Sequence, residues 1–243
     1  MDKPSLRHAA IVMDGNGRWA RKRNLVNIEG HREGVERIPD IMRACRDNKI
    51  EVLTLFAFSS ENWQRPPQEV DALMSLFHLY LSRESKKLRK DGIKLRVIGD
   101  RQGFSKKIRQ AIDNAEDTAN VGDFTLAIAA NYGGKWDIVN SAKQLVYDVL
   151  RDRRDLDSIN EETFHQYTCL ADLPPLDILI RTGNEYRISN FLLWQCAYAE
   201  LFFSEKLWPD FHREEFEAIV AEYYTRQRRF GLHSRQVAGS HLA

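Results

Sequence analysis

The sequence predicts an α/β fold: a single domain, residues 1–243, whose central, mostly parallel six-stranded sheet is flanked by helices. Short β-branched and aliphatic runs alternate with stretches of helical periodicity, an order typical of parallel strands joined by crossover helices. No internal repeat, low-complexity tract or linker rich in Pro, Gly or Ser divides the chain. We expect the core to span about residues 8–230 and both ends to be flexible.

Six apolar runs are the expected strands, and the last is the weakest. They cover residues 8–13, 52–58, 95–99, 124–130, 176–180 and 201–203. Spacings of three and four separate the apolar residues of 68–88 and recur at Ile108, Ile112 and Ala115, which predicts two helices. Further helices are expected to open at Arg18 and near Asp137.

The expected helix over 68–88 is apolar over more than one stripe. Leu76, Leu79 and Tyr80 extend the patch that Leu73 and Phe77 begin. A helix of this kind is either buried on two sides in a large core or borders a cavity. In the second case an apolar tunnel lies between the sheet and the helices.

Charge and cysteine content limit the classes of function. With 36 Lys and Arg against 35 Asp and Glu, there is no basic field for nucleic acid, so any anion site is local. Three widely spaced cysteines, Cys45, Cys169 and Cys196, fit a reducing compartment, which predicts a cytoplasmic protein. No run is long enough for a signal peptide or a transmembrane segment. Peripheral membrane contact stays open, since it needs only one exposed apolar surface.

Polar loops follow four of the expected strands, at the edge of the sheet where ligands of α/β proteins bind. The first begins at Asp14, and its glycines allow a tight turn into a helix whose free N–H groups would face an anion. An acid beside a phosphate indicates a divalent cation between them. The other loops begin at Ser59, Asn131 and Arg181.

Each loop taken alone also fits a structural role. Ser59 could cap the helix that Pro66 introduces, and Trp63 could belong to the core. Four loops rich in hydroxyl, amide, glycine and arginine groups on one edge favour a ligand site instead. The loops offer many hydrogen-bond donors for a phosphate group and few nucleophiles. The sequence contains no P-loop, no G-x-S-x-G elbow and no H-E-x-x-H helix.

Short motifs stand along residues 8–230 in a fixed order: MDGNGRWA (13–20), GH (30–31), FSSENW (58–63), RP (65–66), NYGG (131–134), RTG (181–183), RISNF (187–191), YAEL (198–201) and WP (208–209). In these motifs the chain resembles the cis-prenyltransferases. The resemblance implies that isopentenyl diphosphate is added stepwise, in cis and with Mg²⁺, to farnesyl diphosphate. The implied product is a long-chain polyprenyl diphosphate of the undecaprenyl class, the lipid-carrier precursor for cell-wall polysaccharide.

The resemblance also assigns residue roles. Asp14 and Asn62 are catalytic, and Asp14 and Glu200 are Mg²⁺ ligands. The substrate-binding residues are Gly15, Asn16, Gly17, Arg18, Trp19, His31, Ser59, Ser60, Glu61, Trp63, Arg65, Arg181, Arg187, Ile188 and Ser189. The first six hold or flank the primer's phosphates, whereas Arg181, Arg187 and Ser189 bind isopentenyl diphosphate. Because an amide is a poor base, Asn62 orients the reacting groups, and a diphosphate oxygen or Asp14 receives the proton.

Further expectations follow from the family. The protein is expected to be a homodimer with Arg187 and Glu200 near the interface, and the closed end of its tunnel is expected at Phe124, Leu126 and Ile128. Replacing Asp14 with Ala is expected to leave folding intact and to lower turnover by orders of magnitude.

The chain departs from the family pattern at three positions. Asn27 stands where an arginine is common, so Arg21 or Arg23 could supply that phosphate contact, and Asn184 and Tyr186 change the loop after Arg181. A non-catalytic binding subunit is the alternative to an enzyme, but such a subunit would lack the acid and arginine set. Trans-prenyl synthesis would need Asp-Asp-x-x-Asp motifs, which are absent.

Overall fold

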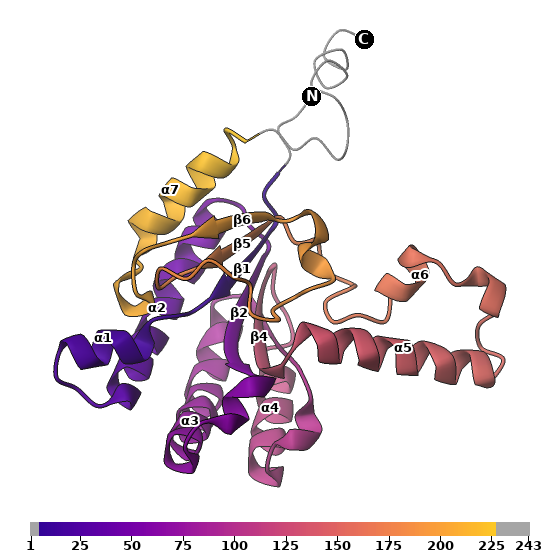
Figure 1. Ribbon diagram of the computed structural model, residues 1–243, viewed down its shortest axis with the longest axis horizontal. Helices are drawn as coiled ribbons and strands as arrows, with labels where there is room; N and C mark the ends of the chain where they lie inside the picture. The colour runs from indigo at the N-terminus through magenta and orange to yellow at the C-terminus, as the bar shows by residue number, and fades with distance from the viewer. Residues whose placement is uncertain (1–4, 227–243) are drawn as a thin grey trace, which may run out of the picture.

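A computed structural model of the chain describes residues 5–226. Its six strands form one sheet in the order β3-β4-β2-β1-β5-β6, and every neighbouring pair is parallel (Figure 1). The strands are β1 (His8–Val12), β2 (Val52–Ser59), β3 (Ile93–Ile98), β4 (Phe124–Tyr132), β5 (Ile178–Arg181) and β6 (Glu200–Phe203). The sequence prediction of six strands is confirmed, and the sheet is parallel throughout.

Seven α-helices are found within residues 5–226. They are α1 (Asn16–Lys22), α2 (Asn27–Asp47), α3 (Pro67–Lys90), α4 (Lys106–Thr118), α5 (Gly134–Leu150), α6 (Glu161–His165) and α7 (Arg213–Tyr223). Two begin earlier than predicted: α1 starts at Asn16 rather than Arg18, and α5 starts at Gly134 rather than near Asp137. Both therefore begin almost directly after a strand, which keeps their first turns at the edge of the sheet.

The two faces of the sheet are covered differently. Side chains that alternate along β1 point to opposite sides, so Ile11 joins one core cluster and Ala10 the other. The larger cluster packs against α2, α3, α4 and α7, whose contributions include Ile41, Leu81 and Phe216. The second cluster is covered by the start of α5 and by irregular segments around residues 170–176 and 188–199. Helices thus cover one face fully and the other only in part.

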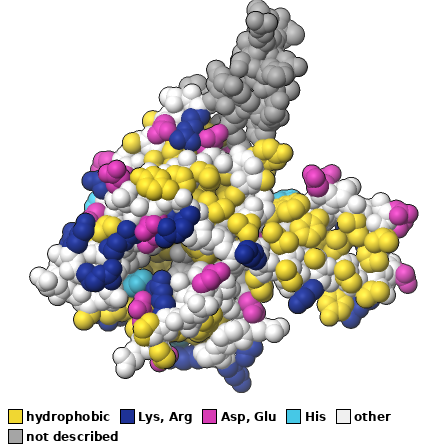
Figure 2. Space-filling view, viewed as in Figure 1, with side chains coloured by type: hydrophobic (Ala, Val, Ile, Leu, Met, Phe, Trp, Pro, Cys, Tyr) yellow, Lys and Arg dark blue, Asp and Glu magenta, His cyan; other side chains and the backbone are white. Residues whose placement is uncertain are grey.

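Helix α5 extends away from the sheet, and together with α6 it forms an arm at one side of the molecule (Figure 1). Apolar side chains gather on this arm in the space-filling view (Figure 2). The exposed ones are Val139, Val146, Tyr147, Leu150, Leu156 and Ile159. Over residues 5–226 no helix is long and apolar enough to cross a bilayer. The expected end of the core near residue 230 lies outside the described residues.

Candidate active site

The four polar loops meet at one edge of the sheet. They follow β1, β2, β4 and β5, which lie side by side in the order β4-β2-β1-β5. Because all these strands are parallel, their carboxyl ends are on the same edge, where ligands bind in sheets of this type. The sequence prediction that the loops share one edge is confirmed.

Close backbone packing fixes the first loop. Gly15 has a φ of 108°, and a Cβ there would lie 2.9 Å from Leu207. Helix α1 rests on α2 at Gly30, where a Cβ would lie 2.0 Å from the backbone oxygen of Asn16. The backbone N–H of Asp14 donates to the Thr182 hydroxyl at 2.9 Å. These contacts attach the loop after β1 to the loop after β5 and to α2.

The Asp14 carboxylate joins the arginines of two loops. Its Oδ2 lies 2.8 Å from Arg181 Nη2 and its Oδ1 lies 3.2 Å from Arg18 Nη2. Arg181, only 4% exposed, also donates through Nη1 to Ser189 Oγ and to the Arg187 carbonyl oxygen, both at 2.6 Å. Burial raises the pKa of Asp14, but hydrogen bonding and charge from Arg181, then Arg18, lower it more, so the group stays ionised.

Glu185 extends this network. Its carboxylate accepts from Arg187 and lies 3.6 Å from Arg18. Arginines that the family resemblance assigns to two different diphosphates therefore converge on one pair of acids. A phosphate group can compete for the partly exposed pairs of Arg18 and Arg187 with Glu185 because the guanidinium forks match its oxygens.

The second loop folds as a short 3₁₀ turn over Ser60–Gln64. The Ser59 backbone N–H donates to Asn62 Oδ1 at 3.0 Å, and the Ser59 side chain accepts from the Asn62 backbone. Ser59 therefore caps this turn and not α3, whose N-cap is Pro66. Trp63 is 38% exposed and donates to Asn131 Oδ1 at 2.7 Å, so it braces the loop from outside the core.

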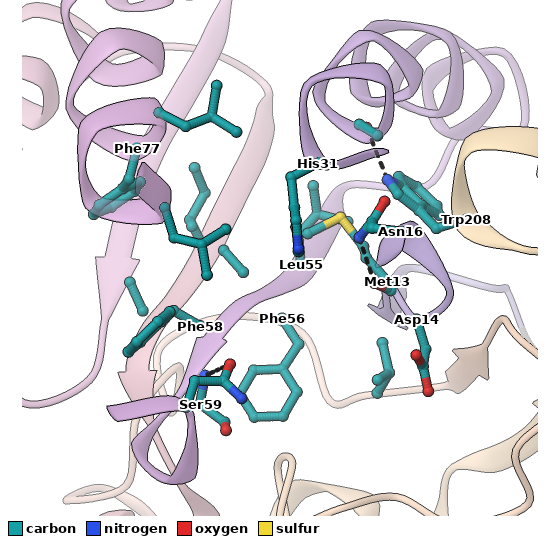
Figure 3. Close-up of a pocket in the computed structure, with 18 of the residues that line it drawn as sticks. Met13, Asp14, Asn16, His31, Leu55, Phe56, Phe58, Ser59, Phe77 and Trp208 are labelled. Atoms are coloured by element: carbon teal, nitrogen blue, oxygen red, sulfur yellow. Dashed lines mark hydrogen bonds between the residues drawn. The ribbon is translucent and has the colours of Figure 1, made fainter. Parts of the chain in front are cut away.

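A cavity of about 600 Å³ opens among these loops and runs between the sheet and helices α2 and α3 (Figure 3). Its polar lining is Asp14, Asn16, His31, Ser59, Glu61, Asn62, Arg65, Arg181, Ser189 and Asn190. Its apolar lining includes Val35, Ile38, Leu55, Phe58, Leu73, Met74, Leu76, Phe77, Tyr80 and Ile128. The volume falls in the range of small-molecule sites, about 300–1,000 Å³.

Two groups at the polar end can donate to a bound anion, the Arg181 guanidinium and the His31 imidazole. Arg181 Nε is buried and has no hydrogen-bond partner within the described chain, and the same holds for Asn16 Oδ1, which as an acceptor suits a donor or a cation instead. His31 points into the cavity (Figure 3), and its burial, with the nearby charge of Arg65, lowers its pKa to about 4. The imidazole is therefore neutral at pH 7. The positive charge at the polar end of the cavity, which we call its mouth, comes from arginine.

Several expected site residues do not line the cavity. They are Gly15, Gly17, Arg18, Trp19, Ser60, Trp63, Arg187, Ile188 and Glu200. Five of them, Gly15, Gly17, Ser60, Trp63 and Ile188, are next in sequence to a lining residue. Trp19 instead donates to Asp210 Oδ1 at 2.7 Å and lies under the Arg23 guanidinium, so its ring is turned away from the mouth.

Glu200 lies at the other end of the sheet from Asp14. It pairs with Ile178, which pairs with Ala9, five residues before Asp14 along β1. At 3.3 Å per residue this places the two acids about 16 Å apart along the strands. Glu200 instead forms an ion pair with Arg226 at 2.9 Å. Among residues 5–226 no cluster of three or more His, Cys, Asp or Glu side chains could hold a metal.

The inner part of the cavity also differs from the expectation. Of the three β4 residues expected at its closed end, only Ile128 lines it, whereas Phe124 and Leu126 are buried in the core. The cavity is bounded at depth by α3, through Leu73, Phe77 and its neighbours. The half-buried Asn27 side chain accepts from Arg21 Nη1 at 3.3 Å, beside Gly17, so the two positions form one unit next to the first loop.

Asn190 is a lining residue that the sequence did not single out as a site residue. The only signal was its place in the RISNF motif, directly after Ser189. Its role depends on which loops come together in space, and the sequence alone does not give that.

At one edge of the parallel sheet, arginines surround an ionised acid at the mouth of a cavity with an apolar interior. These features define a class of protein that binds anions with apolar tails. Comparison with known proteins makes this specific. The family described as putative undecaprenyl diphosphate synthase matches residues 12–231, and this chain belongs to that family.

Relatives and solved structures agree with this assignment. The ditrans,polycis-undecaprenyl-diphosphate synthase of Pseudomonas syringae, named as farnesyl-diphosphate specific, is 52% identical, covering 95% of this chain and 92% of the relative. The enzyme of that name from Escherichia coli K12 is 49% identical, covering 93% and 89%.

Two crystal structures share the fold. Lavandulyl diphosphate synthase from Lavandula x intermedia, in complex with dimethylallyl diphosphate, superposes with a TM-score of 0.89 at 33% identity, covering 95% of this chain and all of that one. A probable undecaprenyl diphosphate synthase from Campylobacter jejuni gives 0.78 at 35% identity, covering 93% and 98%.

Proposed function

We propose that this protein catalyses the Mg²⁺-dependent, sequential cis-condensation of isopentenyl diphosphate onto farnesyl diphosphate, giving a polyprenyl diphosphate of the undecaprenyl class. The observation that carries the proposal is the cavity, which has an arginine-rich mouth around Asp14 and an apolar interior. The assignment of substrate and product is supported by the names of relatives that are about 50% identical to this chain over most of its length.

The mouth suits two diphosphates. The primer's diphosphate would lie over the turn from Gly15 to Arg18, beside His31, with its hydrocarbon tail directed toward Leu55 and Phe77. Isopentenyl diphosphate would bind Arg181, Arg187 and Ser189. Each diphosphate would replace contacts that these arginines now make with Asp14 and Glu185.

The reaction breaks the bond between C1 of the primer and its diphosphate, forms a carbon–carbon bond to isopentenyl diphosphate, and releases a proton. Arginine donors would stabilise the charge that develops on the departing diphosphate, which is the dominant kind of catalysis in such steps. The Asn62 side chain accepts a hydrogen bond from Ser59 and would orient the reacting groups. A diphosphate oxygen or Asp14 would take the proton.

Asp14 fits the role of a Mg²⁺ ligand because it is ionised, half-exposed and next to the arginines that would bind diphosphate. Bound Mg²⁺ would supply further positive charge to the leaving group. Glu200 cannot share a cation with Asp14 of its own chain at the separation given above, so its assignment as a ligand would need a second copy of the protein.

We also propose a homodimer in the cytoplasm. The exposed apolar side chains of the α5–α6 arm form a larger patch than scattered surface residues usually do, and Leu150 alone is 75% exposed (Figure 2). Tyr198 and Leu201, near Glu200, are also exposed. Free cysteines fit a reducing compartment. Peripheral membrane contact would serve the release of a long apolar product.

The test is incorporation of radiolabelled isopentenyl diphosphate into butanol-extractable product, with farnesyl diphosphate and either Mg²⁺ or excess EDTA. Incorporation that requires both the primer and Mg²⁺ supports the proposal. Binding of both diphosphates without incorporation would favour the alternative of a non-catalytic binding subunit. Sedimentation of the native chain and of Leu150→Glu tests the dimer, since a charge in an apolar interface is expected to give monomers.

A further inference from the structure

Two walls of the cavity mouth come from strands that are not neighbours. The turn that carries Glu61 and Asn62 follows β2, and the segment that carries Ser189 follows β5, with β1 between the two strands. Within residues 5–226 no ladder of backbone hydrogen bonds connects these walls directly. Their separation must therefore be set by side chains or by contacts through another element.

Asn190 makes this connection. Its Nδ2 donates to Glu61 Oε1 at 2.8 Å, and its Oδ1 accepts from the backbone N–H of Lys135 at 2.9 Å. Its carbonyl oxygen accepts from the Gly134 N–H at 2.6 Å. One residue thus joins the loop after β5 to the turn after β2 and to the first turn of α5.

The backbone around Asn190 is built for this contact. Asn190 has a φ of 62° and Ser189 a φ of 48°, both in the left-handed region that asparagine tolerates better than most residues. At Gly133 a Cβ would lie 2.6 Å from Asn190 Nδ2 and 2.7 Å from Ser60 Oγ. A glycine at this position leaves the space through which the amide reaches Glu61.

The contact completes a chain of polar groups across the mouth. Asp14 bonds Arg181, and Arg181 donates to Ser189 Oγ. The next residue, Asn190, bonds Glu61, which precedes Asn62. Burial raises the pKa of Glu61, whereas hydrogen bonds from Asn190 and from its own loop lower it, so Glu61 accepts as a carboxylate.

We propose that Asn190 is a positioning residue that sets the spacing between the two diphosphate subsites by holding the Glu61 turn against the loop that carries Ser189. This rests on the proposed function for its catalytic consequence, but the mechanical coupling of the two loops does not. Loss of the contact lets the Glu61 turn move away, and the reacting carbons lose alignment. Misplacement by about 1 Å can cost roughly 100-fold in rate.

The test exchanges the two partners of the hydrogen bond. Asn190→Asp keeps the acceptor for Lys135 but sets a carboxylate against Glu61, and we expect kcat to fall roughly 10- to 100-fold with the KM values changed much less. Glu61→Gln keeps an amide oxygen for Asn190 and measures the loss of the Glu61 charge alone. In the double variant the glutamine amide can donate to the new carboxylate, so kcat is expected to return to the Glu61→Gln level.

Asn114→Asp is the matched control. Asn114 is exposed on α4 and is not among the residues that line the cavity. The variant adds the same charge away from both walls of the mouth, so activity near the native level is expected. Urea unfolding of all four variants checks that each is folded.

Amide hydrogen exchange of residues 59–65 provides a readout that does not need activity. We expect faster exchange in Asn190→Asp and native-like exchange in the double variant. If the single variant exchanges like the native chain, or if the double variant has the product of the two single losses, the proposal is overturned. If the native chain itself incorporates no isopentenyl diphosphate, the proposed function fails, and exchange alone decides whether Asn190 couples the loops.

Discussion

Removing the Asp14 carboxylate separates its structural role from its catalytic role. In Asp14→Ala the buried Arg181 loses the one carboxylate that it contacts within residues 5–226 and keeps the Ser189 hydroxyl and the Arg187 carbonyl oxygen. Breaking a buried ion pair costs about 3–5 kcal/mol. Because Asp14 is partly exposed and two acceptors remain, we expect a loss of about 2 kcal/mol.

Asp14→Asn is the matched variant. Its amide oxygen can still accept from Arg181, so the free energy of unfolding is expected to fall by less than about 1 kcal/mol. Neither variant retains the negative charge that would hold Mg²⁺, so turnover is expected to fall about 100- to 1,000-fold in both. Asp14→Ala is therefore still expected to fold, but with a lower free energy of unfolding, because Arg181 is buried and the sequence did not show this.

Urea unfolding and steady-state incorporation of isopentenyl diphosphate are the two assays. With an m-value of about 3 kcal/mol per M, a loss of 2 kcal/mol lowers the midpoint by about 0.7 M in Asp14→Ala. Turnover near the native level in Asp14→Asn would refute the metal role. A midpoint unchanged in Asp14→Ala would refute the ion pair as a stabilising contact.

Three further predictions follow from the packing, the buried histidine and the occupied carboxylate. Gly30→Ala is expected to destabilise the fold by about 1–3 kcal/mol, because its Cβ would meet the Asn16 backbone oxygen at 2.0 Å. The control Glu36→Ala, on the exposed face of α2, should change stability by less than about 0.5 kcal/mol. Equal urea midpoints for the two variants would contradict this prediction. Burial lowers the pKa of His8 from 6.5 to about 4, so below pH 6.5 the unfolded chain binds a proton that the folded chain does not. His8 should therefore account for a loss of about 3 kcal/mol between pH 6.5 and 4, and His8→Gln should remove that share of the slope and leave the share of His31. Both Asp14 oxygens now contact arginines, which a bound diphosphate would draw away from the carboxylate. Calorimetry should therefore show that Mg²⁺ binds at least about tenfold more tightly when farnesyl thiodiphosphate is present than when it is absent. Equal affinities would contradict competition between the arginines and the cation.

The sequence predicts the scaffold of this site well. Strand runs such as 124–130 are apolar except for Thr125, and a turn such as the one at Gly15 needs a glycine for its positive φ. Both features can therefore be recognised from the local sequence. Because parallel order puts all carboxyl ends on one edge, the meeting of the four loops follows from topology alone.

What the sequence could not give is the direction of individual side chains. Trp19 belongs to the first loop but turns to Asp210, a residue far along the chain, and Trp63 packs its ring on Phe58 while it stays partly exposed and donates to Asn131. The register of β6 against β5 takes Glu200 away from Asp14. Each outcome depends on packing between distant segments, as does the contact of Asn190 with Glu61.

We propose that the mouth around Asp14 joins isopentenyl diphosphate to an allylic primer in cis, with the growing chain in the apolar cavity. Mass spectrometry and NMR can measure the length and double-bond geometry of the product formed from farnesyl diphosphate and ¹³C-labelled isopentenyl diphosphate with Mg²⁺. We expect a ladder of polyprenyl diphosphates ending near the undecaprenyl length, with every new double bond cis. Trans double bonds, or no elongation of the primer, would contradict it.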